Sequence, residues 1–185
     1  MAEYYLVSQL PSLDAVGENT PLPITEERFL ELCNQHLVKK AQKEIQQMTL
    51  VPPINLEVAN SALINAWNES ERNLRLALGK VRAEKMNKPF NVGNVILPVE
   101  YMRAASTAAE MENPMEAEEY LNRYRLSILE ALRPMDIFSE EYILYYGIKL
   151  KLLLRKRLFD TQSGETAYKN IYNSILNGDR LEAKQ

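Results

Sequence analysis

The chain has 185 residues, of which 46% are hydrophobic and 25% charged, and its formal net charge is −3. This length suits a single domain with a real hydrophobic core, and the composition is typical of soluble proteins. One cysteine excludes an internal disulfide, and the acidic balance disfavours nucleic acid as a partner. The start lacks the basic segment of a signal peptide, and no apolar run approaches the roughly 20 residues of a membrane-spanning helix. We expect a cytoplasmic protein without direct membrane insertion.

The charges fall into blocks of alternating sign along the chain. Lys and Arg minus Asp and Glu gives −4 for residues 1–60, +3 for 61–103, −6 for 104–141 and +4 for 142–185. Opposite blocks attract, either within one fold or between this chain and a charged partner. Both alternatives follow from the pattern.

The N-terminal third predicts an extended element followed by a helix. The aromatic and β-branched start reads "YYLVSQL" and is typical of a short strand or extended arm, and a loop rich in Pro, Gly and Asx follows it. Thr25 is then a suitable N-cap residue, with Glu26 and Glu27 in the first turn of a helix. Its predicted buried face, spaced at three to four residues, is Phe29, Cys33, Leu37, Ala41, Ile45 and Met48. The prolines of "VPPINLE" end this helix.

A second long helix is predicted from about Glu57 to Met86. Its apolar stripe consists of Leu63, Trp67, Leu74, Leu78 and Val81. Trp67, the only tryptophan, lies on this stripe, so a place in the core is favoured over an anchor for a partner. The segment 87–100 then interrupts the helices and is a possible sub-boundary; within it, "NVILPV" is consistent with a short strand or a packed loop.

The C-terminal half predicts four more helical segments. A short one runs from Tyr101 to Met111. Asn113, Pro114 and Glu116 have the spacing of a helix start, and the buried face of that helix is Ala117, Leu121, Tyr124, Ile128 and Leu132. Ser139 caps a helix to about Phe159, and a last helix near Thr166 to Asn177 ends at Gly178. The sum is an all-α bundle in one domain, residues 1–185, with a short extended N-terminal element.

The sequence contains none of the motifs that would indicate catalysis. There is no glycine-rich P-loop, no Rossmann fingerprint, and only one His and one Cys for a zinc site. Cys33 and His36, three residues apart, could form a thiolate–imidazole pair, but core packing is the favoured interpretation. The acidic run "EMENPMEAEEY" is interpreted as a solvated helix start and not as a metal site. We expect no enzyme, no cofactor and no small-molecule substrate; an enzyme using Glu71 or His36 in a pocket is the weakest alternative.

The segment Lys149–Phe159 is the strongest sequence candidate for a partner-binding surface. It reads "KLKLLLRKRLF", with five cations among six apolar residues. On a helix, Ile143, Tyr146, Leu150, Leu153 and Leu158 approximate a buried stripe, from which the cations should project. They either form a solvated face that answers the acidic block 104–141 or contact an acidic protein, with anionic lipid a weaker alternative. The candidate partner-binding residues are Lys149, Lys151, Arg155, Lys156 and Arg157.

Three segments resemble a bacterial family whose genes lie among those of V-type ATP synthases. The first is "YYLVSQLPSLD", followed after a gap by "FLELC". The second is Trp67 leading into "ERNLRLALGKVRAEK". The third is "EAEEYLNRYRLSILEAL" followed by "IFSEEYILYYGIKLKLLLRKRLF".

That family is in turn distantly similar to the C subunit of V- and A-type ATPases (d in eukaryotes), a helical, non-catalytic adaptor between the central shaft and the rotor ring. The resemblance implies that the partners are V-type ATPase subunits and that the protein is peripheral on the cytoplasmic face of the inner membrane. The C subunit is longer, with three helical lobes, so a shortened adaptor and an assembly factor both stay open. The competing hypothesis is an unrelated helical scaffold or regulator that dimerises.

Overall fold

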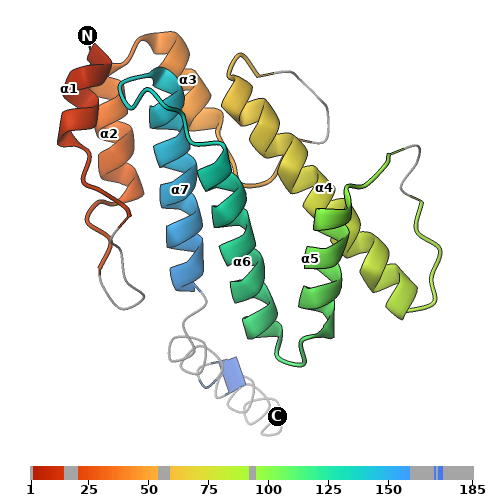
Figure 1. The fold of residues 1–185 in the computed structure, drawn as a ribbon. Coiled ribbons are helices and arrows are strands. Elements are labelled where there is room, and N and C mark those ends of the chain that lie inside the picture. Colours follow the sequence, from red (N-terminus) through yellow and green to blue (C-terminus); the bar gives the residue numbers. More distant parts are fainter. Residues whose placement is uncertain are drawn as a thin grey trace, which may run out of the picture.

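A computed structural model gives the fold (Figure 1) and describes residues 2–14, 21–53, 59–91, 95–158, 169 and 171–172. Among these residues there is no strand, and the predicted all-α class is confirmed. The helices are, in chain order, α1 (Ala2–Gln9), α2 (Glu26–His36), α3 (Lys39–Gln47), α4 (Ala62–Lys85), α5 (Val99–Glu110), α6 (Pro114–Ala131) and α7 (Glu140–Leu158). No helix in this part of the chain combines the length and apolarity needed to cross a bilayer.

Helix α7 is the central element of one end of the molecule. It contacts α2, α3, α4 and α6, while α1 packs on α2. At the other end, α5 packs between α4 and α6 (Figure 1). The long helix α4 and helix α6 therefore run through both ends and join them.

Three predicted helix starts have the expected caps. The hydroxyl of Thr25 accepts a hydrogen bond from the Arg28 amide at 3.2 Å. The side-chain oxygen of Asn113 accepts one from the Met115 amide at 3.0 Å, with Pro114 in the first turn. The hydroxyl of Ser139 accepts one from the Tyr142 amide at 3.2 Å. These caps join residues two or three positions apart, and for that reason the local sequence predicts them.

The prediction of an extended N-terminal element is wrong, because residues 2–9 form helix α1. Leu6 on this helix is fully buried in the core, whereas Tyr4 and Tyr5 are exposed. Aromatic and β-branched residues favour strands only when a neighbouring strand offers a pleated surface to pack on. Here the neighbour is α2, and a helix buries Leu6 against it.

The single helix predicted from Thr25 to Met48 is also wrong, since the chain breaks at Leu37 and Val38. Both residues have extended backbone angles, and they separate α2 from α3. The Gln42 side chain donates to the carbonyl oxygens of Asn34 and Leu37 at 2.9 and 2.7 Å, replacing helical bonds lost at the break. The residues predicted for the buried face are nevertheless all buried, because both short helices turn theirs inward: Phe29, Cys33, Leu37, Ala41, Ile45 and Met48.

The buried residues form two hydrophobic clusters. The first combines α1–α3, the start of α4 and most of α7, and it contains Trp67, which is 1% exposed. The second combines the rest of α4 with α5 and the first half of α6. Of the core residues expected from sequence, four are buried and two are half-buried against the second cluster: Trp67, Leu74, Leu78 and Leu121, and then Tyr124 and Ile128.

Some predicted features lie wholly or partly outside the described residues. These are Phe159, the predicted end of α7, and most of the last helix from Thr166 to Asn177 with Gly178. The helix predicted from about Glu57 instead begins at Ala62, because residues 59–61 are not helical and Ser61 is its N-cap residue. In the described part of "NVILPV", residues 95–98 are irregular and Val99 begins α5.

Candidate functional site

Lys149 is the centre of a buried ion-pair cluster, not an exposed contact residue. Its side chain is 9% exposed, and its ammonium group donates to Asp14 at 2.5 Å and to Glu130 at 2.6 Å. The phenol of Tyr145 donates to the same Glu130 carboxylate at 2.7 Å. The prediction that Lys149 projects into solvent is therefore wrong. The cluster ties the segment after α1 and the end of α6 to the middle of α7.

The cluster shifts the pKa of each of its members. Hydrogen bonding from Lys149 lowers the pKa of Asp14. Burial raises the pKa of Glu130, but the hydrogen bonds from Lys149 and Tyr145 outweigh it and the net shift is downward. Burial also opposes the charge of Lys149, yet its three hydrogen-bond partners raise its pKa. Burial, aided by the bond to Glu130, raises the pKa of Tyr145 to about 12. At neutral pH, Asp14, Glu130 and Lys149 are therefore charged, and Tyr145 keeps its proton and can donate it to Glu130.

A small cavity of about 140 Å³ lies beside this cluster. It is lined by the segment that follows α1 and by one face of α7, including Leu10, Tyr142 and Tyr146. The phenol of Tyr146 donates to the carbonyl oxygen of Pro11 at 2.8 Å. Ligand pockets usually measure roughly 300–1,000 Å³. The cavity here is smaller, and its charged lining residues Lys149 and Asp14 are paired with each other. The arrangement favours a structural joint over a ligand site.

The other α7 cations pair with acidic residues of neighbouring helices. Lys151 bonds to Glu26 and Arg155 to Glu118, with side chains 23% and 26% exposed. The Lys156 ammonium lies 3.7 Å from Glu119, and the structure also gives Arg157 an interaction. The described cations of α7 thus pair within the fold with acidic residues of both acidic blocks: Lys149 and Lys151 reach residues of 1–60, and Lys149, Arg155 and Lys156 reach residues of 104–141.

Glu71 lies in a second buried ion-pair network, at the boundary between the two hydrophobic clusters. It is 2% exposed and accepts from Arg125 at 2.9 Å and from Arg75 at 2.8 Å. Arg125, 4% exposed, also reaches Glu118, the partner of Arg155. The network therefore links α4, α6 and α7, and the Glu71 carboxylate is engaged by two guanidinium groups.

The sequence contains a signal for this network. Glu71 follows Trp67 by four residues and precedes Leu74 by three, so it occupies the one gap in the apolar stripe of α4. On α6, Arg125 lies beside Tyr124 of the predicted stripe, and its burial next to Leu121 and Leu129 is seen only in the structure. The sequence therefore marks Glu71 as a residue of the buried face but does not identify Arg125 as its partner.

Cys33 and His36 do not form a catalytic pair in the structure. Burial raises the pKa of Cys33 to about 12, which keeps the thiol protonated and unreactive at neutral pH. His36 Nε2 lies 3.1 Å from the side-chain nitrogen of Gln9 on α1. Across the described ranges, no group of three or more His, Cys, Asp or Glu side chains could hold a metal ion.

Sequence reasoning missed an exposed aromatic patch at the start of α7. We define it as Tyr4, Tyr5, Met135, Ile137 and Phe138. The rings of Tyr4 and Phe138 lie 4.8 Å apart between centroids, and Tyr4 also meets Tyr5 edge to face at 6.1 Å. Yet all five side chains are 40% or more exposed, and Met135 is fully exposed. The sequence could have indicated this patch, because apolar residues are concentrated in the predicted loop "RPMDIFS", where they are expected to be exposed.

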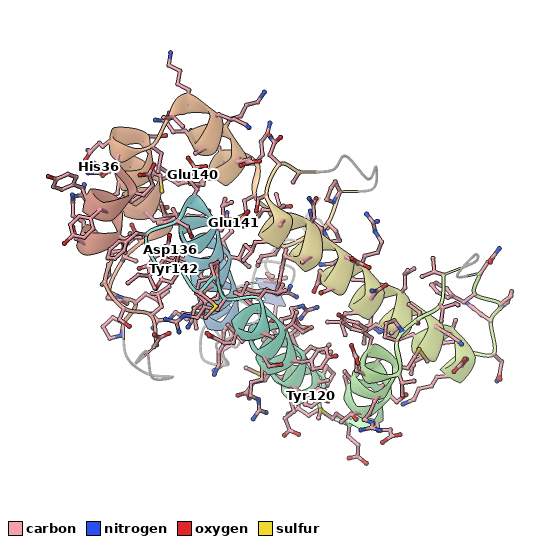
Figure 2. The ribbon with its side chains drawn as sticks, turned by 45° about the horizontal axis from the view of Figure 1, so that its top comes forward. His36, Tyr120, Asp136, Glu140, Glu141 and Tyr142 are labelled. Atoms are coloured by element: carbon pink, nitrogen blue, oxygen red, sulfur yellow. The ribbon has the colours of Figure 1, made fainter. Side chains whose placement is uncertain are left out.

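Acidic side chains border the aromatic patch. Figure 2 shows Asp136 and Glu140 at the beginning of α7, on the side where α1 and α2 lie. Both residues are exposed. The patch therefore combines apolar anchors with negative charge, and it stands on helix ends that are fixed to the core.

Comparisons with known proteins give no relative for this chain. No protein-family model matches it, and it matches neither a curated protein nor a solved structure.

Proposed function

We propose that this protein is a non-catalytic accessory component of a V-type ATP synthase, and that it acts through protein contacts made by the aromatic patch. The observation that carries the proposal is the patch itself. Large aromatic and aliphatic side chains exposed together and bordered by charge are typical of protein interfaces. Tyr4 and Phe138 are 55% and 40% exposed although their rings contact each other.

The position of the patch supports the link to the ATP synthase. All of its residues except Met135 come from the first and third of the segments that resemble the family encoded among V-type ATP synthase genes. Those two segments also meet at Lys149 with Asp14, and at Tyr146 with Pro11. A joint that holds the two segments in one orientation suits a protein whose contact surface spans both.

A retention assay tests the proposal. The tagged chain is co-expressed with V-type ATP synthase subunits from the same organism, and retained subunits are quantified. We expect wild type to retain them and Tyr4→Ser with Phe138→Ser to lose at least about tenfold, because anchors at an interface centre carry most of the binding energy. Val38→Ser with Val51→Ser is the matched control, since both valines are exposed outside the patch.

The outcomes separate the competing hypotheses. Failure of the wild-type chain to retain any ATP synthase subunit would refute the proposal. Equal retention by the patch variant and the control would show that the aromatic patch is not the surface that binds the ATP synthase. A concentration-dependent dimer that dissociates only in the patch variant, measured by light scattering, would favour the dimerising scaffold instead.

A further inference from the structure

A second exposed surface lies along the outer side of α4. Arg75, Gly79, Arg82 and Met86 follow one another at intervals of four, three and four residues, which places them on one helix face. The chain after α4 returns along this face, and the ring of Phe90 rests on Gly79. A Cβ at Gly79 would lie 2.7 Å from the tip of that ring. Glycine at this position therefore allows the loop to pack directly on the arginine face.

This surface is apolar and basic together. Met86 and Phe90 are 58% and 42% exposed. Residues 72–88 contain six cations and one carboxylate, and residues 89–99 contain no charge. Arg82 and Lys88 are exposed, and the Arg75 side chain is 40% exposed. Glu71 is shared between Arg75 and the buried Arg125, so it only partly offsets the charge of Arg75.

The backbone holds this surface in a defined shape. Asn87 has a positive φ of 52°, and the amides of Asn87 and Lys88 bond back to the carbonyl oxygens of Glu84 and Ala83 at 3.1 and 2.9 Å. These two bonds form a Schellman ending, which reverses the chain immediately after α4. Lys85 donates to the carbonyl oxygen of Ala109 and thereby ties α4 to the end of α5. The loop is thus fixed at its start.

From these observations we infer that the α4 surface, defined as Arg75, Arg82, Met86, Lys88 and Phe90, binds an acidic, partly apolar segment of a protein partner. The inference rests on the proposed function, in which that partner is another subunit of the ATP synthase. Charge complementarity sets the sign of the partner, because the surface is positive within an acidic chain. Arg, Met and Phe beside one another on a helix face match the composition of protein interfaces. A lipid-binding amphipathic helix instead separates its apolar face from a polar face rich in Lys and Arg, whereas here Arg82 and Met86 lie on the same face.

The two surfaces lie on opposite sides of the molecule. In Figure 1 the α4–α5 connection is at the far side from α1, and Figure 2 shows the same separation after rotation. One surface is bordered by Asp136 and Glu140, and the other contains Arg75 and Arg82. A chain built in this way contacts two partners of opposite charge and bridges them.

Site-specific photo-crosslinking tests the inference. A benzophenone amino acid replaces Met86, and separately Val51 as an equally exposed control, in the complete chain bound to the ATP synthase. We expect the Met86 probe to crosslink to an ATP synthase peptide rich in Asp, Glu and apolar residues, and the Val51 probe not to do so. Arg82→Glu with Lys88→Glu should reduce that crosslink at least about tenfold, and Lys39→Glu with Lys40→Glu, an equal charge change on exposed residues of α3, should leave it.

Each contrary result has a distinct meaning. Loss of all co-purification by wild type refutes the proposed function and this inference with it. Co-purification without a Met86 crosslink, or with equal crosslinks in the two charge variants, overturns this inference alone. A crosslink to a second copy of the chain does the same. The inference is also overturned if the wild-type chain sediments with phosphatidylcholine vesicles that contain phosphatidylserine and Arg82→Glu with Lys88→Glu abolishes this sedimentation. In that case lipid would be the ligand of the surface.

Discussion

The carboxylate of Glu141, in the first turn of α7, accepts a 2.7 Å hydrogen bond from the hydroxyl of Ser61, the N-cap residue of α4. It also accepts from the amides of Ala62 and Leu63 at 3.2 Å each, while the Ser61 hydroxyl accepts from Ile64 at 3.1 Å. Figure 2 shows Glu141 where the two helices begin close together. One carboxylate thus satisfies free amides of α4 and places negative charge at the positive ends of two helix dipoles.

This shared cap predicts non-additive losses of stability. We expect Ser61→Ala to lower the free energy of unfolding by about 1 kcal/mol, and Glu141→Gln by about 1–2 kcal/mol, since a charge-assisted acceptor is replaced by a neutral one. The double variant should lose less than the sum, because each change removes the same contact. Urea unfolding of the four proteins gives the coupling energy, and a value of zero would contradict the shared cap.

The Lys149 cluster predicts a pH dependence. Asp14 and Glu130 have lowered pKa values in the folded chain. Their contribution is therefore complete above their unfolded pKa values, about 4, and is lost as the pH falls through the folded ones. The pKa of Lys149 is raised, so its contribution is complete below about 10.4 and is lost as the pH rises through its folded pKa.

Lys149→Met makes this dependence measurable. The difference in unfolding free energy between wild type and Lys149→Met should be constant between about pH 6 and 9 and shrink below about pH 4. Lys40→Met on the exposed start of α3 is the control and should show no such trend. A difference that stays constant down to pH 2.5 would mean that the ion pairs of Lys149 do not contribute to stability.

At Gly147, packing and helix propensity predict opposite effects of substitution by alanine. Alanine within a helix is favoured over glycine by about 1 kcal/mol. A Cβ at Gly147, however, would lie 2.5 Å from the Met48 terminal methyl and 3.1 Å from the Phe29 ring, both buried. Overpacking of this kind costs about 1–3 kcal/mol, so Gly147→Ala should lower the melting temperature. Its cost should be smaller in a Met48→Ala background, and an equal cost in both backgrounds would exclude the contact with Met48 as the cause.

The buried network of Glu71 predicts a different response to single and double substitution. Removing one partner of a buried ion pair costs about 3–5 kcal/mol, because a charge is left without its partner. Glu71→Leu and Arg125→Met should each fall near the lower limit, since Arg75 and Glu118 still engage the residue that remains. The loss of stability in the double variant should be smaller than the sum of the losses in the two single variants. Chemical denaturation measures this, and strict additivity would show that the pair is not coupled.

Trp67 predicts a graded loss of stability. Trp67→Ala should cost about 3–5 kcal/mol, the usual loss for a large buried aromatic side chain. Trp67→Phe should cost much less, because the indole N–H has no hydrogen-bond partner within the described ranges and phenylalanine removes that unpaired donor. The relevant measurement is thermal unfolding together with retention of the ATP synthase. A Trp67→Ala chain with unchanged stability but lost retention would make Trp67 a contact residue and not a core residue.

The sequence by itself determined the features that depend on neighbours along the chain. Thr25, Asn113 and Ser139 cap helices through bonds to amides two or three residues away, and the apolar stripes of α2, α3 and α4 follow from helical periodicity. These features were predictable because a cap or a stripe has the same geometry in any fold that contains the helix.

Only the tertiary structure decided the features that depend on distant residues. Helix α1 forms where its sequence favours a strand, because Leu6 has a helical neighbour to pack on. Lys149 is buried because Asp14, 135 residues earlier, and Glu130 both reach its ammonium group. Glu71 likewise meets Arg125 across 54 residues. A charged residue looks solvent-exposed in any local pattern, and only a partner supplied by another helix offsets the desolvation that its burial requires.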